Sequence, residues 1–205
     1  MHLTRAKTHT AMSHARKGVI YIARPLSHSS SSISVIHAIR DVLKIASTAR
    51  EVKLLVNEKK IKINGRVVRD VREPIHLLGI LEADKRYIMT LMPTGKYALV
   101  ESKGTTRVAK VVGKKMLKNG VLQINFHDGT NAIKKAKDVQ VGDSAKLNNN
   151  EIIEFIKLDK GAKVFVYKGR SKGQEGKVAS VHDGVLTIEL EGKKVSLAGD
   201  QVVAI

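Results

Sequence analysis

The sequence predicts an α+β chain built from several small modules: a helix–helix–hairpin module, a central β-rich module and a compact β module after it. Between residues 33 and 56, apolar residues recur at three- and four-residue steps, which is typical of helices. From about residue 86 onward, short apolar segments separated by turn residues are typical of strands. The 205 residues, 42% of them hydrophobic, are enough for about one to three domains with real cores.

Residues 1–32 are predicted to form an irregular basic arm. Residues 1–24 contain five Lys or Arg and no acidic residue. Arg24 precedes a proline and is therefore biased toward extended backbone. A run of four serines, Ser29 to Ser32, ends the arm. Basic arms of this kind often order only against a nucleic acid surface.

Two successive helices are predicted after the arm. The first covers residues 33–46, and its apolar face consists of Ile33, Ile36, Ile39, Leu43 and Ala46. The second begins at Thr48, because Thr48 and Glu51 have the spacing of a capping box just ahead of an apolar pattern. Basic residues lie one turn apart on both helices: Arg40, Lys44, Arg50 and Lys53.

A β-hairpin follows the second helix. Residues 61–63 alternate as a strand does, and residues 66–69 return as a second short strand. Asn64-Gly65 between them predicts a type I′ turn, because both residue types accept positive φ. Both helices and both strands therefore present basic side chains, and the module ends at about residue 85.

The central module, residues 86–157, is predicted to be a small barrel or curled sheet. Its expected strands cover residues 87–91, 97–100, 108–112, 121–126 and 130–133. Turns are expected at 93–95, at Asp128-Gly129 and at 148–150. Repeated short strands with regular turns favour this architecture.

The last module, residues 158–205, is predicted to be all β. Its expected strands cover residues 163–166, 185–190 and 195–197. Between the first two strands, Gly169, Gly173 and Gly176 punctuate a basic stretch. Glycine allows a loop backbone to bend sharply and to approach phosphates closely.

The charge predicts a polyanionic partner. There are 37 Lys and Arg against 19 Asp and Glu, which gives a net charge of +18 and a pI near 10.1. The excess is spread over several segments, with ten basic and four acidic residues in 40–72 and seven basic and two acidic in 157–178. A single cluster would indicate a solvated surface, whereas several indicate an extended RNA or DNA footprint. No run of 18 apolar residues and no apolar core of signal-peptide type occurs.

Motifs for catalysis and metal binding are not found in the sequence. Without Cys there are no disulfides, no thiolate metal sites and no Cys nucleophile, which fits a cytoplasmic protein. The stretch near Gly176 departs from a Walker loop, because Ser171 replaces the first Gly and Val178 replaces the Ser/Thr. His9 and His14 are the closest histidine pair and lack nearby carboxylates. We therefore expect no enzyme, no metal and no cofactor.

Three Asp residues are further candidates for catalytic acids. His127-Asp128 has the look of a catalytic pair, but Asp-Gly is turn chemistry. Asp41 or Asp70 would be candidates for the Asp of an RNA-modifying enzyme, yet no catalytic domain of suitable size remains in the chain. Asp41 is expected to pair with a neighbouring Arg or Lys instead.

Two segments resemble known RNA-binding modules. Residues 40–46, 48–55 and 61–66 together resemble the αL domain of bacterial small-subunit ribosomal protein four, which also occurs in pseudouridine synthases and tyrosyl-tRNA synthetases. Lys59-Lys60 departs from that pattern, in which Gly usually closes the second helix. Because a non-Gly residue in left-handed geometry is costly, we expect this turn to be shaped differently. Residues 163–178 resemble a KOW motif, which implies an SH3-like KOW β-barrel.

The order of arm, αL domain, β-domain and KOW module resembles the S4e family of archaeal and eukaryotic small-subunit ribosomal proteins. Residues 2–5, 69–70, 123–131 and 141–144 add to the resemblance. The departures lie in the arm, which lacks the family's usual Trp and its Pro-rich segment. The short chain favours the archaeal type. The resemblance implies a cytoplasmic, ribosomal protein whose partners are small-subunit rRNA and neighbouring ribosomal proteins, with no membrane and no small-molecule substrate.

The basic residues of the two modules are the predicted RNA contacts. We expect phosphate neutralisation to dominate and base stacking to be minor, since only 3% of residues are aromatic. Two other functions stay open: an RNA-modification or translation-rescue accessory protein that uses the αL domain, and a transcription elongation factor that uses the KOW module. The predicted RNA-binding residues are Arg5, Arg40, Lys44, Arg50, Lys53, Lys60, Lys62, Asn64, Arg66, Arg69, Lys168, Gly169, Arg170, Lys172, Gly173, Gly176 and Lys177.

Overall fold

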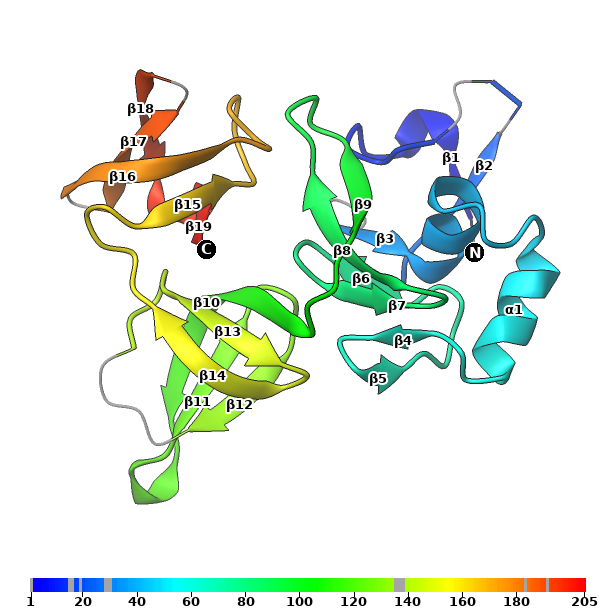
Figure 1. The fold of residues 1–205 in the computed structure, drawn as a ribbon, viewed down its shortest axis with the longest axis horizontal. Coiled ribbons are helices and arrows are strands. Elements are labelled where there is room, and N and C mark those ends of the chain that lie inside the picture. The colour runs from blue at the N-terminus through cyan, green and yellow to red at the C-terminus, as the bar shows by residue number, and fades with distance from the viewer. Residues whose placement is uncertain are drawn as a thin grey trace. The chain divides into compact units, whose positions relative to one another are not determined.

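The computed structural model describes residues 2–14, 17–18, 20–27, 31–134, 139–182, 184–190 and 192–205. The chain divides into two compact units, residues 1–105 and 106–205 (Figure 1). Most elements are strands and few are helices. A multi-domain, β-rich α+β chain is therefore confirmed in its coarse outline.

The first unit contains two small helical turns, one α-helix and nine strands within the described residues. Strands β4, β5, β7, β8 and β9 form one sheet in the order β5-β4-β7-β8-β9, while β1 pairs with β2 and β3 with β6. The bounds are β1 His2–Thr4, η1 Arg5–Lys7, β2 Tyr21–Ala23, β3 Ser32–Ser34, η2 His37–Val42, α1 Ala49–Asn57, β4 Lys62–Ile63, β5 Arg66–Val67, β6 Pro74–His76, β7 Ile80–Glu82, β8 Arg86–Leu91 and β9 Tyr97–Glu101.

The arm is more regular than expected in its described part. Strands β1 and β2 pair antiparallel with Leu3 opposite Ile22, and Ile22 is buried. The N–H of Arg5 extends this pairing by donating to the carbonyl of Ile20 at 3.0 Å. Ser29 and Ser30 of the predicted serine run lie outside the described residues.

The helix predicted over residues 33–46 is wrong in extent and in type. Its first residues form β3, in which Ile33 pairs with Ile75 of β6. The helical part, η2, is a π-helix, and the N–H of Leu43 donates to the carbonyl of Ala38, five residues back, at 2.9 Å. Ile33 and Ile39 are both buried, so the apolar pattern marked a buried segment that changes from strand to helix.

The second helix, α1, begins as predicted. The hydroxyl of Thr48 accepts the N–H of Glu51 at 3.3 Å, and the Glu51 carboxylate accepts the N–H of Ser47 at 2.8 Å. These bonds satisfy donors that a helix start leaves unpaired. Val52 and Val56 are buried and hold the helix on the unit.

The turn after α1 has a left-handed shape, although the absence of Gly at Lys59-Lys60 predicted a different one. Lys59 has φ of +59°, and the N–H groups of Lys59 and Lys60 donate to the carbonyls of Val56 and Leu55 at 3.0 and 3.1 Å. This is the Schellman arrangement, in which Gly is the usual residue at the position of Lys59. The expectation of a differently shaped turn is therefore wrong, and the lysine is held in a strained conformation.

Replacing Lys59 by Gly is expected to raise the free energy of unfolding by about 0.5–1 kcal/mol, because Gly adopts this backbone conformation without steric strain. Lys60→Gly is the matched control, because it removes the same charge at the neighbouring residue, where φ is not positive. This variant should lower the free energy of unfolding. Urea unfolding midpoints of the three proteins test this. Equal midpoints for the two variants would contradict it.

The Asn64-Gly65 hairpin is confirmed. Asn64 and Gly65 have φ of +52° and +80°, and Ile63 pairs with Arg66 across the turn. The Asn64 side chain also accepts the N–H of Ile80 at 2.9 Å, which fastens the hairpin to β7. The returning strand ends at Val67, two residues earlier than predicted.

The division between the two units lies after Thr105, whereas the sequence placed the end of the helical module at residue 85. The reason is strand pairing. β8 pairs with β7, with Tyr87 opposite Leu81, and β9 pairs with β8. The strands expected to open the central module therefore complete the sheet of the first unit.

In its described residues, the second unit contains two five-stranded sheets, each with its own apolar cluster. Their strand orders are β12-β11-β10-β13-β14 and β18-β17-β16-β15-β19. The bounds are β10 Thr106–Met116, η3 Lys118–Gly120, β11 Leu122–Phe126, β12 Asn131–Lys134, β13 Ser144–Asn148, β14 Glu151–Ile156, β15 Lys163–Val166, β16 Glu175–His182, β17 Val185–Leu190, β18 Lys193–Ala198, η4 Gly199–Gln201 and β19 Val202–Ala204.

The six predicted strands of this unit are found, several with shifted ends, whereas β13, β14, β16 and β19 were not predicted. β10 is longer than expected and contains a bulge between Val111 and Gly113. β18 extends beyond 195–197 at both ends, whereas β15 and β17 match their predicted bounds. The Asp128-Gly129 turn is confirmed, since the N–H of Phe126 donates to the carbonyl of Thr130 at 2.9 Å. Strands β13 and β14, which flank the predicted turn at 148–150, were not foreseen.

Lys110 of β10 joins the two sheets of the second unit. Its side chain is buried, and Nζ donates to the carbonyls of Gly199 at 2.5 Å and Val202 at 2.7 Å. The Tyr167 ring lies 5.5 Å from this nitrogen. Burial lowers the pKa of Lys110 to about 8, from an ordinary 10.5.

This pKa predicts how stability depends on pH. Between about pH 8 and 10.5 the unfolded chain binds more protons at Lys110 than the folded chain, so the free energy of unfolding should rise with pH in that window. Lys110→Met should remove this part of the slope, while Lys157→Met, an exposed lysine of the same unit, should not. Urea unfolding at several pH values is the measurement. The same slope in both variants would contradict the prediction.

Candidate nucleic-acid interface

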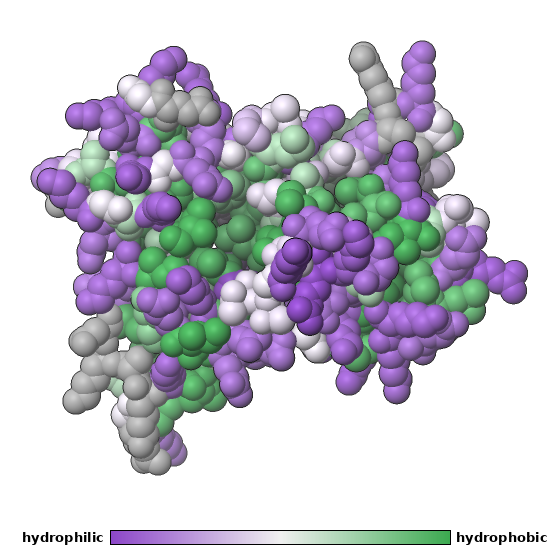
Figure 2. All heavy atoms as spheres, in the orientation of Figure 1, coloured by the Kyte–Doolittle hydropathy of each residue, from purple (hydrophilic) through white to green (hydrophobic). Residues whose placement is uncertain are grey.

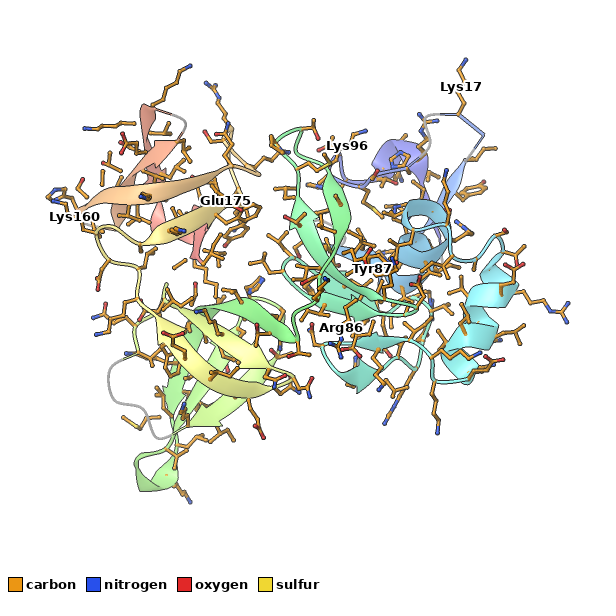
Figure 3. The ribbon with its side chains drawn as sticks, viewed as in Figure 1. Lys17, Arg86, Tyr87, Lys96, Lys160 and Glu175 are labelled. Carbon is orange, nitrogen blue, oxygen red and sulfur yellow. The ribbon has the colours of Figure 1, made fainter. Side chains whose placement is uncertain are left out.

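Five exposed cations of the first unit are available to a polyanion. They surround α1 and the β4–β5 hairpin, and within the described residues none of them lies within ion-pair distance of a carboxylate. Nitrogen-tipped side chains project outward from this part of the unit (Figure 3), where hydrophilic residues lie among apolar ones (Figure 2). These five residues, called the cation cluster below, are Lys44, Arg50, Lys53, Lys62 and Arg69.

Three other predicted RNA contacts are tied to carboxylates. Arg66 lies 2.5 Å from Glu73, and Lys60 lies 2.7 Å from Glu58. Arg40 donates to Asp41 through both Nε and Nη2, at 2.7 and 2.9 Å, which raises the pKa of the guanidinium. These cations are partly neutralised by their carboxylate partners. The sequence analysis did not distinguish them from the cations that have no such partner.

Glu73 organises the loop that carries Arg69, a role the sequence did not reveal. It is buried, and one carboxylate oxygen accepts the N–H of Arg69 at 2.7 Å and of Asp70 at 3.2 Å. The other oxygen accepts from Arg66. A single buried acid therefore holds the hairpin and the following loop in register. Only its position before Pro74 marks it in the sequence.

The remaining candidates of the first unit have different surroundings. Arg5 is half-buried in η1. Asn64 uses its side chain to accept from Ile80, so it shapes the hairpin as expected. The RNA-binding role of all these residues stays a prediction.

In the second unit, a basic loop connects β15 and β16. It contains Lys168, Gly169, Arg170, Lys172 and Gly173, and the two glycines have φ of +90° and +85°. The N–H of Gly173 donates to the carbonyl of Val166 at 2.7 Å, which closes the loop. Lys168 is exposed, lies 3.7 Å from Asp200 and sits over the Tyr167 ring at 5.4 Å.

Gly176 and Lys177 belong to a strand and not to that loop. Gly176 pairs with Val164, and a Cβ built on it would lie 2.5 Å from the carbonyl oxygen of Glu189. Glycine is therefore required for close packing of β16 on β17, which corrects the loop-bending role given to it from the sequence. Lys177 is exposed on β16, and its cross-strand neighbours are Lys163 of β15 and Glu189 of β17.

The acids that resembled catalytic groups are engaged in structural contacts. Asp128 accepts the N–H and the hydroxyl of Thr130 at 2.9 and 2.6 Å and forms a buried ion pair with Arg107. Asp41 binds Arg40 and His37, and Asp70 accepts the N–H of Arg72 at 2.8 Å. Turn chemistry at Asp128 and ion pairing at Asp41 agree with the sequence-based interpretation.

The described residues contain neither a metal-binding cluster nor a membrane-spanning helix. Among these, no three His, Cys, Asp or Glu side chains gather so as to hold a metal ion. The described helices include none with the length and apolar character needed to cross a membrane.

Comparison with known proteins gives consistent similarities. Residues 83–152 match the family model described as ribosomal family S4e. The small ribosomal subunit protein eS4 of Korarchaeum cryptofilum is 30% identical over 175 residues, covering 82% of this chain and 74% of the relative. The eS4 of Picrophilus torridus is 30% identical over 164 residues, covering 77% and 70%. The crystal structure of the 30S ribosomal protein S4e from Thermoplasma acidophilum has a similar fold, with a TM-score of 0.74 at 22% identity, covering 85% of this chain and 95% of that one.

Proposed function

The chain belongs to the S4e family of small ribosomal subunit proteins, and from this premise we propose that it is a structural constituent of the small ribosomal subunit that binds rRNA through its basic surfaces. The observation that carries the rRNA-binding role is the cation cluster: five exposed cations, around one helix and one hairpin, that no carboxylate neutralises in the described residues. Its place in the cell is then the ribosome, in the cytoplasm.

The mechanism follows from charge and RNA geometry. Helical RNA hides its base edges in a deep and narrow groove, so proteins contact its backbone, its 2′-hydroxyls and its loops. Arg offers a bidentate fork to phosphate and Lys a point charge. The cation cluster and the loop at 167–174 would hold rRNA phosphates, while Asn64 and Gly65 would shape the hairpin. The chain would thus support subunit assembly as a ligand for rRNA and not as an enzyme.

Two finer assignments form part of the proposal. Residues 33–85 would be an αL-type RNA-binding module, supported by the capped helix α1 followed by the Asn-Gly hairpin. Residues 158–205 would be a KOW module with an SH3-like barrel, supported by β15, the glycine loop and the five-stranded sheet. The partners would be small-subunit rRNA and neighbouring ribosomal proteins.

Sedimentation tests the function. A tagged copy is expressed in its native cells, and the lysate is centrifuged through a high-salt sucrose gradient. Retention in the small-subunit peak, near one copy per particle, is the expected result. Release to the top of the gradient, or a peak with the large subunit or with RNA polymerase, would contradict the proposal and favour an accessory role in translation or transcription.

A further inference from the structure

A half-open pocket of about 330 Å³ lies in the first unit, where the basic arm meets the end of η2. The arm contributes His14 and Ile22, and the remaining lining residues are Arg40, Asp41, Lys44, Ala46 and Ser47. The volume is at the lower end of the range typical for small-ligand sites. The pocket therefore has room for one small polar molecule or for one unit of a polymer.

Two walls of the pocket are apolar and buried. Ile22 is 2% exposed and Ala46 is 5% exposed, although both line the pocket. Small apolar walls of this kind suit the flat face of an aromatic ring. They are a poor surface for a bare inorganic anion, which needs donors on several sides.

The cation at the pocket is held rigidly. Arg40 donates two hydrogen bonds to Asp41, and Asp41 accepts a third from Nδ1 of His37 at 2.9 Å. His37 is fully buried and its other ring nitrogen lies 2.8 Å from the carbonyl of Ser13. Of the five N–H groups of the guanidinium, two are used by Asp41, so others remain to meet a ligand in a fixed orientation. The acid in the pocket is thereby neutralised and does not repel an anion.

The backbone at the pocket is in unusual conformations. The π-helix η2 widens its last turn, and the N–H of Ile45 donates to the carbonyl of Ile39 at 3.0 Å. Lys44 follows with φ of +56°, a conformation that costs a non-Gly residue roughly 1–2 kcal/mol. Widened helical turns and strained residues occur frequently at functional sites. Here they place Lys44 next to Arg40 and Ser47 in one lining.

His14 lines the pocket. Its Nδ1 is buried and, within the described residues, has no hydrogen-bond partner. Burial lowers the pKa of His14, which favours the neutral ring, and a neutral ring has one nitrogen that can accept a hydrogen bond. Buried polar atoms without partners are uncommon in folded proteins, which marks this position as one that a ligand would complete.

We propose that this pocket binds a single unstacked nucleotide of RNA. The base lies between Ile22 and Ala46, with its edge on His14 and Ser47, and the phosphate lies on Lys44 and Arg40. The proposal rests on the rRNA-binding function and makes it more specific: the first unit holds one extruded nucleotide in addition to phosphates of the backbone. Single-stranded nucleotides are the part of RNA whose bases are accessible for such recognition.

Binding of mononucleotides tests the pocket without an assumption about the RNA sequence. The full-length protein, labelled with ¹⁵N, is titrated with AMP, UMP, ribose 5-phosphate and inorganic phosphate, each up to millimolar concentration. We expect at least one mononucleotide to shift the amides of residues 14, 22 and 44–47 in a saturable way. Ribose 5-phosphate and phosphate should bind at least about tenfold more weakly, because they lack the base. Equal binding of phosphate alone, or no saturable shift with either mononucleotide, would overturn the proposal.

Two matched variants separate the pocket from general charge. Lys44→Gly removes the side chain at a left-handed position that Gly accepts, so the fold is preserved. Lys59→Gly makes the same change at the other left-handed lysine of the unit, outside the pocket. We expect Lys44→Gly to weaken mononucleotide binding about tenfold, as for a lost hydrogen bond to a charged group, and Lys59→Gly to leave it unchanged. Equal affinities of the two variants would overturn the assignment.

Failure of the pocket and failure of the proposed function give different results. If the chain sediments with small subunits but no mononucleotide binds, only the pocket is wrong. If mononucleotides bind but the chain does not sediment with small subunits, the ribosomal function is wrong and the pocket stands.

Discussion

Replacing Asp128 by alanine is expected to destabilise the second unit by about 3–5 kcal/mol. Asp128 and Arg107 form an ion pair in which both side chains are only 2% exposed. Without the carboxylate, the Arg107 guanidinium would keep three longer contacts: Thr130 at 3.2 Å, the carbonyl of Asn149 at 3.4 Å and the side-chain oxygen of Asn150 at 3.4 Å. A buried charge without its counter-charge is among the few defects that have effects of this size.

Native-state hydrogen exchange of the amides in β10 and β11 measures this effect locally. Asp159→Ala removes an exposed acid of the same unit and should change the opening free energy by less than about 0.5 kcal/mol. The double variant Arg107→Met, Asp128→Leu should be less destabilised than Asp128→Ala, because neither charge remains buried. An effect of Asp128→Ala as small as that of Asp159→Ala would contradict the structural role of the pair.

Replacing the whole cation cluster by glutamine is expected to lower the affinity for small-subunit rRNA at least about a thousand-fold at 0.1 M salt. Each phosphate contact that is lost removes about 0.9 from the slope of log K against log salt, so five contacts would reduce the slope by about 4 to 5. The variants lie on exposed positions, so the fold should be retained.

The control has the same net charge but keeps the cation cluster. It carries glutamine at five other exposed positions, Lys7, Lys17, Lys96, Lys103 and Lys157. Lys17 and Lys96 project from the edge of the first unit away from the β4–β5 hairpin (Figure 3). Filter binding at several salt concentrations should show a much smaller loss for this control. Equal losses and equal slopes in both variants would mean that net charge alone, and no localised surface, determines binding.

The elements that could be predicted from the sequence are those whose signals are local. The capping box at Thr48 and the Asn-Gly turn each depend on residues within three or four positions, and both are found as expected. The prediction of a helix over 33–46 was wrong because Ile33 pairs with Ile75, forty-two residues away. This strand pairing overrides the local helical pattern. Lys59 was missed for a different reason: the backbone hydrogen bonds that close α1 hold it in a left-handed conformation that the residue alone disfavours.

The sequence predicted which residue types form the candidate site, but not which of its cations are free of a carboxylate partner. Basic residues were identifiable from spacing, yet which of them are neutralised depends on acids placed by the fold, such as Glu73 beside Arg66. The buried contacts Arg107–Asp128 and Lys110–Gly199 join residues 21 and 89 positions apart, beyond the reach of any local pattern. The pocket at His14 likewise requires the arm to return to the end of η2, which the sequence did not indicate.

Ultraviolet cross-linking of intact small ribosomal subunits, followed by mass spectrometry of nucleotide-bearing peptides, tests the central claim most directly. We predict cross-links between rRNA and peptides covering residues 44–69, with further cross-links from the loop at 167–174. Absence of the chain from purified small subunits, or rRNA cross-links confined to other segments of the chain, would contradict the claim that this surface holds rRNA.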